Sequence, residues 1–217
     1  MWYEHLFQEL ENLRNNDNAI PMAAYMKNRF PFLGIKKPVR AALTKPYLKA
    51  SKQQAVDWDF VENCWNKDYR EAQYIAVDYL LLHQQRLSED DLTRIAEYIT
   101  RKSWWDTVDG LDEVVGTLAS KYPHLKHTVL TWSKNGNLWL RRVSINFQQK
   151  YKENTDTQLL EEVIINNLGS GEFFINKAIG WSLREYSKTN PDWVRAFLAR
   201  HQSSLSSLSL REAGKYI

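Results

Sequence analysis

The sequence predicts an all-α fold made of repeated helical hairpins, and three observations lead to this prediction. Apolar residues recur at the helical spacing i, i+3, i+4, i+7 along almost the whole chain. The 217 residues include only 8 glycines and 6 prolines, and hairpin dipeptides between alternating strands are missing. From residue 57 onward the predicted helices also fall into pairs of near-constant spacing.

The first part of the chain, residues 1–50, precedes the paired helices and is predicted to form helices of its own. Their expected ranges are 2–15, 21–30 and 38–44. A chain of 217 residues suits one sizeable unit better than two enzyme domains. We therefore expect a single domain over residues 1–217, with N-terminal helices over 1–50 and helical pairs over 57–217.

Two of the paired helices carry clear starting signals. Ser88 and Asp91 have the spacing of a capping box ahead of an apolar stripe. Asn190 is expected to cap a later helix, with Pro191 in its first position. The expected pairs are 57–66 with 70–85, 88–100 with 104–121, 124–134 with 137–151, 157–167 with 172–188, and 190–202 with 205–217.

The first helices of these pairs begin near positions 57, 89, 124, 157 and 191, so that the successive start-to-start spacings are 32, 35, 33 and 34. Such a repeat predicts a right-handed α-solenoid of HEAT-like hairpins, in which each hairpin packs on its neighbours and leaves one long concave face. A compact all-α bundle is the alternative, because the apolar pattern does not fix the superhelical curvature.

Charge and cysteine content limit the possible functions. The 29 Lys and Arg against 26 Asp and Glu give a net charge of +3, which does not by itself indicate nucleic acid. The single cysteine, Cys64, excludes an internal disulfide framework and a CxxC site, so a reducing, cytoplasmic location is expected. No apolar run reaches the roughly 18 residues of a membrane span. His124 and His127 have no third ligand placed to join them, and we expect no metal, no cofactor and a monomer.

The stretch SWWDTVDG, residues 103–110, is unusually rich in tryptophan and aspartate. Trp104 begins an apolar stripe with Val108, Leu111, Val115 and Leu118, and it is therefore predicted to be core. Ser103 and Asp106 have capping-box spacing, which predicts a structural role for Asp106 at the helix start. The remaining residues share a second stripe on a helix face that is predicted to lie outside the core. They are Trp105, Asp109 and Asp112.

The next two repeats carry similar stripes beside their cores. Trp139 and Arg142 share one of them. The other holds Phe174, Lys177, Trp181 and Arg184. The spacings between the aromatic positions 105, 139 and 174 are 34 and 35, and the spacing between the cationic positions 142 and 177 is 35. Aromatic and cationic side chains in register on one face suit the binding of phosphate and the stacking of a base or sugar. Solvated charges and stem-packed aromatics are the alternative.

At these residues the sequence resembles the bacterial AlkD family of DNA alkylation repair glycosylases, which are HEAT-like repeat proteins. The matching segments are AAYMKNRFPFLGI at 23–35, KSWWDTVD at 102–109, LWLRR at 138–142 with FQ at 147–148, and EFFINKAIGWSLREYSKTNPD at 172–192. The resemblance covers nearly the whole chain, and the last segment is long enough to be specific.

The resemblance implies a monofunctional glycosylase that excises cationic N3- and N7-alkylated purines, such as 3-methyladenine and 7-methylguanine, from double-stranded DNA. It implies catalytic roles for Trp105, Asp109 and Trp181. Contact would be made with the backbone and sugar of the lesion, without a base-flipping pocket. DNA contacts are expected on the concave face, from Tyr25, Trp139, Arg142, Lys177 and Arg184. A non-catalytic DNA-binding or scaffolding protein of the same fold is the alternative function.

Overall fold

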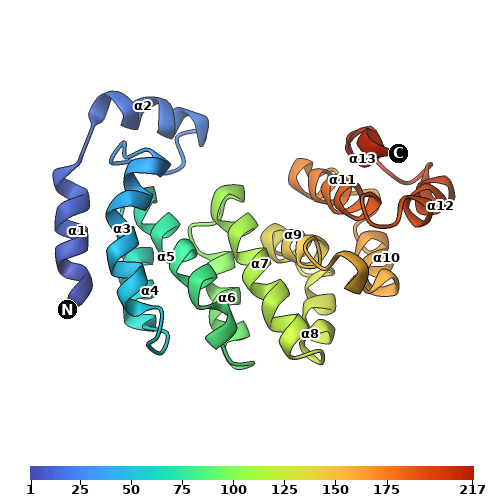
Figure 1. Cartoon of the computed structure of the whole chain (residues 1–217). Helices are drawn as coiled ribbons and strands as arrows, with labels where there is room; N and C mark the ends of the chain where they lie inside the picture. The colour runs from blue at the N-terminus through green and yellow to red at the C-terminus, as the bar shows by residue number, and fades with distance from the viewer. The chain divides into compact units, whose positions relative to one another are not determined.

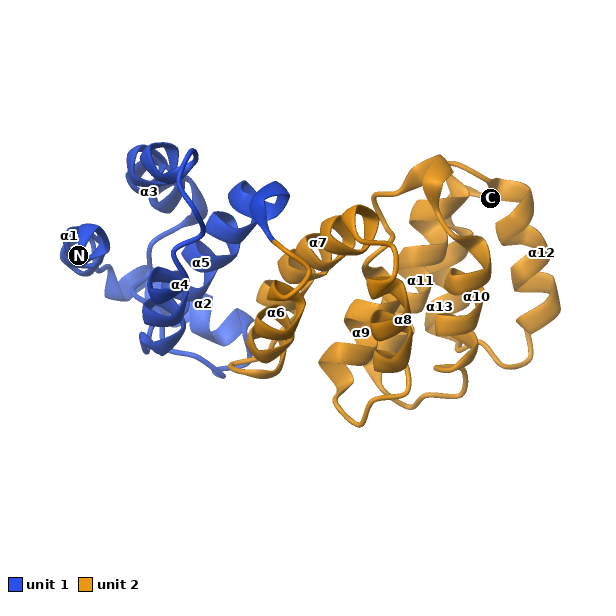
Figure 2. Ribbon diagram, turned by 90° about the horizontal axis from the view of Figure 1, so that it is seen from below, with its two compact units in different colours: residues 1–87 blue, residues 88–217 orange.

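The structure, a computed structural model, describes all of residues 1–217 and consists of α-helices and short 3-10 helices with no β-strand (Figure 1). The all-α prediction is confirmed. The chain divides into two compact units, Met1–Leu87 and Ser88–Ile217 (Figure 2). The single domain over 1–217 stays a prediction. None of the helices combines the length and the apolar character that crossing a membrane requires.

Unit 1 is built around four helices. Helix α1 packs on α3, α3 packs on α5, and α4 forms a hairpin with α5. The core includes Leu6 and Leu10 of α1 together with Phe60 and Trp65 of α4. The helices of this unit are α1 (Trp2–Asn12), α2 (Asn16–Tyr25), α3 (Lys37–Ser51), α4 (Trp58–Asn66), α5 (Arg70–His83) and the 3-10 helix η1 (Gln84–Arg86).

The predicted N-terminal ranges are partly wrong in unit 1. Helix α2 begins at Asn16 because the side chain of Asn15 accepts a hydrogen bond from the Asn18 N–H at 3.0 Å. It ends at Tyr25, shortly before Lys27 and Asn28 take positive φ angles of 58° and 53°. Helix α3 runs through the proline at position 46 to residue 51, well beyond the expected end at 44.

Unit 2 holds the four helical pairs that follow α4 and α5 along the chain. The start-to-start spacings of the first helices of the five pairs are 33, 34, 32 and 34, and those of the second helices are 35, 33, 35 and 34, so the predicted repeat is confirmed. The second helices α7, α9, α11 and α13 pack side by side in that order. The α-helices of unit 2 are α6 (Asp91–Thr100), α7 (Trp105–Lys121), α8 (Leu125–Trp132), α9 (Leu138–Asn146), α10 (Thr157–Ile165), α11 (Phe173–Ser187), α12 (Pro191–His201) and α13 (Ser207–Ala213). Its 3-10 helices are η2 (Lys152–Asn154) and η3 (Gly214–Tyr216).

The predicted start signal of α12 is confirmed, and that of α6 is confirmed in part. Asn190 caps α12 by accepting a hydrogen bond from the Trp193 N–H at 3.0 Å, as expected. Before α6, the Asp91 carboxylate accepts hydrogen bonds from both the N–H and the hydroxyl of Ser88, at 2.8 and 3.0 Å. Of the two hydrogen bonds in a capping box, only the one from the Ser88 backbone N–H to the Asp91 side chain forms. The Ser88 hydroxyl donates to the Asp91 carboxylate and so does not accept from the helix backbone.

The start of α7 differs from the prediction. Ser103 donates its hydroxyl to the Ile99 carbonyl at 2.7 Å, and the cap position of α7 is Trp104, so the predicted capping box of Ser103 with Asp106 is wrong. Asp106 still lies in the first helical turn, where a carboxylate is favourable, and accepts a hydrogen bond from the Thr107 N–H at 3.1 Å. The core stripe is confirmed, because all of its members are buried: Trp104, Val108, Leu111, Val115 and Leu118.

Candidate functional site

Helices α7, α9 and α11 bring several of the predicted site residues together in unit 2. Asp109 of α7 and Arg142 of α9 form a bidentate ion pair, with Nε 2.7 Å from Oδ1 and Nη2 2.8 Å from Oδ2. The Asp109 side chain is 24% exposed and that of Arg142 only 1%. Two parallel hydrogen bonds fix the plane of a carboxylate as well as its position. Asp109 is therefore held with one edge against Arg142 while part of it faces solvent.

Arg142 also reaches the third helix. Its Nη1 donates to the Phe174 carbonyl at 2.6 Å, and its guanidinium carbon lies 5.5 Å from the centre of the Trp181 ring. Arg142 was predicted to lie on a face that the core does not claim, and this placement is wrong. Because α7 and α11 pack on either side of α9, the arginine is enclosed between helices and presents almost no surface to a DNA phosphate in this conformation.

Trp181 is half-buried and surrounded by positive charge. Besides Arg142, Lys177 Nζ lies 5.4 Å and the Arg184 guanidinium carbon 5.7 Å from its ring centre. Both residues are on α11, one turn before and one turn after the tryptophan. Cations within about 6 Å of an indole face are attracted by its quadrupole. The structure thus confirms the predicted grouping of an aromatic residue with cations on α11.

A residue that the sequence analysis missed completes this group. Glu212 of α13 accepts hydrogen bonds from Lys177 at 2.8 Å, Arg184 at 2.9 Å and Lys215 at 2.7 Å. The hydrogen bonds from Lys177 and Lys215 lower the pKa of Glu212 to about 2. The repeat offered a signal for it, because positions 142, 177 and 212 lie at successive intervals of 35 in the second helices.

Asp112 lies one turn beyond Asp109 on α7 and is buried. Burial raises the pKa of Asp112 well above its usual value, and the nearby Asp109 raises it further. Arg142 and a hydrogen bond with Asn146 oppose this rise. The two carboxyl groups on this stripe of α7 therefore differ, since Asp109 is paired with an arginine and Asp112 resists ionisation.

Trp139 is buried in an aromatic cluster. Its ring centre lies 5.7 Å from that of Trp104 and 5.1 Å from that of Phe174, and the Trp104 and Phe174 centres are 4.9 Å apart. Trp139 is only 9% exposed, so its predicted placement on an open face is wrong. Neighbouring second helices cover both sides of α9, which leaves the indole a packing role beneath the site.

The remaining predicted residues lie at two places. Trp105 is the first residue of α7, half-buried and one turn before Asp109. Tyr25 belongs to unit 1, where it is the last residue of α2 and 70% exposed. We use the term candidate site for the unit 2 residues Trp105, Asp109, Arg142, Lys177, Trp181 and Arg184.

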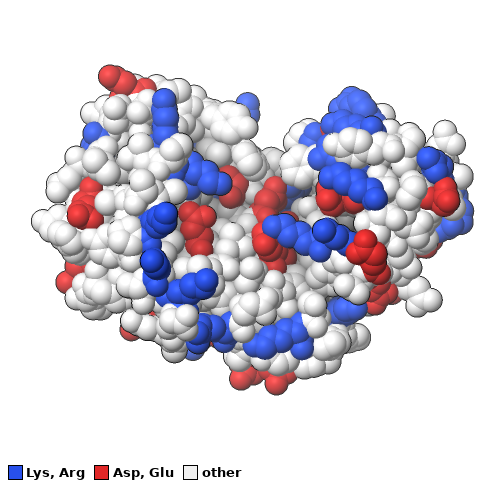
Figure 3. Space-filling view, in the orientation of Figure 1, with Lys and Arg blue, Asp and Glu red and all other residues white.

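Lys and Arg side chains gather in several groups on the face shown in Figure 3, with Asp and Glu side chains among them. No group of three or more His, Cys, Asp or Glu side chains is placed to hold a metal ion. His124 instead pairs with Glu89, at 2.7 Å. The cations around Trp181 come from two helices, Lys177 and Arg184 from α11 and Arg142 from α9.

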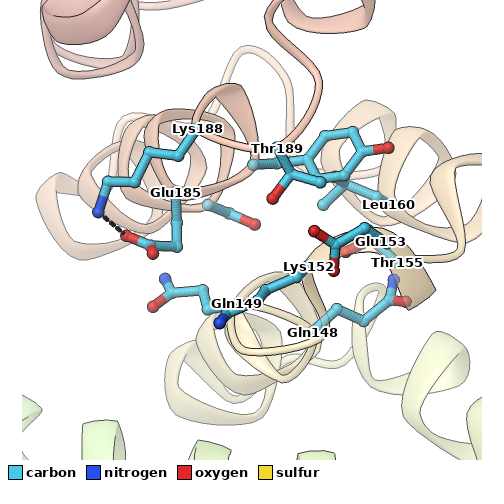
Figure 4. A pocket seen from close by; sticks show the side chains of 11 residues that line it. Gln148, Gln149, Lys152, Glu153, Thr155, Leu160, Glu185, Lys188 and Thr189 are labelled. Carbon is cyan, nitrogen blue, oxygen red and sulfur yellow. Dashed lines mark hydrogen bonds and ion pairs between the residues drawn. The ribbon is translucent and has the colours of Figure 1, made fainter.

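A polar pocket of about 280 Å³ lies between the segment after α9 and the C-terminal part of α11 (Figure 4). Its lining carries both signs of charge, and Lys188 donates to Glu185, one turn earlier at the end of α11, at 2.6 Å. It shares no residue with the candidate site. The wall residues are Gln148, Gln149, Lys152, Glu153, Thr155, Leu160, Ser182, Glu185, Tyr186, Lys188 and Thr189.

Comparison with known proteins relates the chain to one family. The family described as DNA alkylation repair enzyme matches residues 6–217. A solved structure of a predicted DNA alkylation repair enzyme from Enterococcus faecalis is 39% identical, with a TM-score of 0.87 over 94% of this chain and 96% of that one. The crystal structure of smu.31 from Streptococcus mutans UA159 is 19% identical, with a TM-score of 0.58 over 82% and 97% of the two chains, and is similar in fold alone. No curated protein matches the chain.

Proposed function

Because the chain belongs to the DNA alkylation repair enzyme family, we propose that it is a monofunctional DNA glycosylase of base excision repair. Its substrates are cationic N3- and N7-alkylated purines, such as 3-methyladenine and 7-methylguanine, in double-stranded DNA. The observation that carries the proposal is the Asp109 carboxylate held by Arg142, whose guanidinium carbon lies 5.5 Å from the centre of the Trp181 ring.

The chemistry of the lesion sets what the site must do. A purine that carries a formal positive charge is already a good leaving group, so its departure does not depend on a general acid. Positive charge then develops on C1′ of the deoxyribose as the glycosidic bond breaks. The enzyme's task is to stabilise that charge and to supply a water molecule to the sugar.

Asp109 suits this task through its position and its orientation. A carboxylate about 4 Å from a unit positive charge stabilises it by about 4 kcal/mol at an effective dielectric near 20. The two hydrogen bonds from Arg142 hold the carboxylate in one orientation, so little reorganisation is needed as the charge develops. The exposed part of Asp109 can accept a hydrogen bond from the attacking water.

The tryptophans add selectivity for charge. The indoles of Trp105 and Trp181 flank the deoxyribose of the lesion, and each face stabilises a nearby cation by about 0.5 to 2 kcal/mol. The same faces offer little to a neutral base. Selectivity for cationic lesions therefore comes from the lability of the lesion together with these aromatic faces.

The base remains in the duplex while the enzyme contacts its sugar and backbone. Enzymes that flip a base enclose it in a snug pocket. Contact with the sugar and backbone alone, which the family resemblance implies, needs no such pocket. Lys177 and Arg184 contact phosphates of the duplex from α11, and Tyr25 contacts it from unit 1. The enzyme acts as a monomer in the cytoplasm.

Release of free 7-methylguanine or 3-methyladenine from alkylated duplex DNA tests this function directly. The parent is expected to release the base and to leave an abasic site without cutting the strand. Asp109→Asn removes the charge and keeps the shape, so it should slow release by at least about 100-fold while duplex affinity stays close to that of the parent. Salt-sensitive duplex binding with no release of either base would instead support a DNA-binding scaffold.

A further inference from the structure

We propose that Glu212 is a positioning residue, which holds Lys177 and Arg184 beside the Trp181 ring and so prepares the α11 side of the candidate site for a DNA phosphate. The inference rests on the proposed function and adds to it a residue from the last helix of the chain. Glu212 itself touches no reacting atom. It acts through the two cations that it binds.

The first observation is the crowding of positive charge around one indole. Lys177, Arg184 and Arg142 all lie close to the Trp181 ring centre, at 5.4, 5.7 and 5.5 Å. Like charges repel, and lysine and arginine side chains lose much rotamer freedom when they are held in one place. A carboxylate shared by two of the three cations offsets both effects.

The second observation is that Glu212 is itself fixed. Helix α13 packs directly on α11 at Gly180, where an added Cβ atom would lie only 2.5 Å from Cβ of Glu212. One turn before Glu212, Ser209 donates its hydroxyl to the Asn176 carbonyl of α11 at 2.8 Å. The Glu212 side chain is 5% exposed. Its carboxylate is therefore a fixed anchor for Lys177 and Arg184, the two α11 cations near Trp181.

The third observation is the net charge of the cluster that Glu212 forms with its cationic partners. One carboxylate faces Lys177, Arg184 and Lys215, so the cluster keeps a net positive charge. The side chains of Lys177 and Arg184 are 24% and 25% exposed, which leaves part of each available to a ligand. Cations that are held in place and keep a net positive charge bind a phosphate group better than neutral ion pairs or flexible side chains do.

Glu161 provides a matched control within the same unit. It accepts two hydrogen bonds from Arg200, both at 3.0 Å, and lies 3.3 Å from His201, so that it joins α10 to α12. Like Glu212 it is a carboxylate that binds basic side chains of another helix. Its partners do not include any residue of the candidate site.

The experiment compares Glu212→Gln, Glu161→Gln and the parent in two assays. Single-turnover release of 7-methylguanine from alkylated duplex should slow by about 10- to 100-fold in Glu212→Gln, the range expected when a binding group is misplaced. Its affinity for unmodified duplex should be equal or tighter, because a negative charge has been removed near the DNA. Glu161→Gln should match the parent in both assays.

A third measurement does not depend on activity. The indole N–H signal of Trp181 in the ¹H–¹⁵N spectrum, assigned with Trp181→Phe, should move in Glu212→Gln and stay in place in Glu161→Gln. Glu212→Asp, which keeps the charge but shortens the side chain, should give an intermediate rate.

The possible outcomes separate the two proposals. Parental excision by Glu212→Gln, or a rate loss matched by an equal loss of duplex affinity, would overturn the positioning role. An unmoved Trp181 signal would overturn it even in a protein without glycosylase activity. Failure of the parent to release any base would overturn the proposed function alone, since the Trp181 signal and duplex affinity would still report on Glu212.

Discussion

Asp109 and Arg142 meet through two parallel hydrogen bonds of 2.7 and 2.8 Å, and the arginine is almost completely buried while the aspartate is not. This asymmetry assigns different tasks to the two residues. Arg142 holds the Asp109 carboxylate from the buried side, and it donates its other hydrogen bond to the Phe174 carbonyl of α11. Asp109 is the member of the pair that a substrate can reach.

Arg142 is therefore expected to affect catalysis more than DNA affinity. Arg142→Met should slow base release by about 100-fold, because Asp109 loses the partner that orients it. The salt dependence of duplex binding should remain that of the parent, because the buried guanidinium contacts no phosphate. Arg184→Met is the matched comparison, and it should lower the slope of log K against log salt by about 0.9, the effect of one phosphate contact. A similar drop in slope for Arg142→Met would show that the arginine leaves its buried place to bind DNA.

Asp112 should make stability depend on pH in a defined direction. Its pKa in the folded protein is raised above the ordinary 3.8, mainly by burial, so the folded state holds the proton more tightly than the unfolded chain. The stability that protonated Asp112 contributes is fully present below the pKa of the aspartate in the unfolded chain. It is lost as the pH rises through the higher pKa of Asp112 in the folded protein. The Asp112→Asn variant has no carboxyl group to ionise and so does not suffer this loss. The melting temperature of the variant minus that of the parent should therefore grow by a few degrees as the pH is increased. The exposed Glu97→Gln on α6 serves as control and should show no such trend.

Glu212 should act with the opposite sign. Its pKa falls from 4.5 to about 2 in the folded protein, chiefly through the hydrogen bonds from Lys177 and Lys215. The stability that it contributes is present above pH 4.5 and is lost as the pH falls through about 2. The melting temperature of the parent should therefore exceed that of Glu212→Gln near neutral pH, and the difference should shrink toward pH 2. A difference that is constant over this range would mean that the ionised carboxylate does not stabilise α13.

Gly180 should tolerate no side chain. A Cβ atom there would lie 2.5 Å from Glu212 Cβ and 3.1 Å from the Ser209 carbonyl oxygen. Gly180→Ala should push α13 away from α11 and lower the free energy of unfolding by about 1 to 3 kcal/mol in a denaturant titration. Gly171→Ala is the control, because an added Cβ there meets no atom within 4 Å. Equal stability of the two variants would show that the contact between α11 and α13 relaxes easily.

Much of the fold and part of the site could be predicted from local patterns. Apolar spacing placed the hairpins and buried the stripe that begins at Trp104, because a helix repeats its faces every turn whatever packs against them. The cap at Asn190 was correct for a similar reason, since it depends on a single side chain and the next turn. The same logic failed at Asn15, where the prediction did not use the capping asparagine, and at Ser103, whose hydroxyl bonds back to α6.

The sequence by itself determined the all-helical class, the near-constant repeat of the helical pairs and the stripe that groups Trp105 with Asp109. Only the tertiary structure decided which side chains of neighbouring repeats meet. It buried Arg142 and Trp139, paired Asp109 with Arg142, and brought Glu212 to the cations beside Trp181. The physical reason is that helical phase gives the direction of a side chain on its own helix, whereas burial and ion pairing depend on the helices packed on either side.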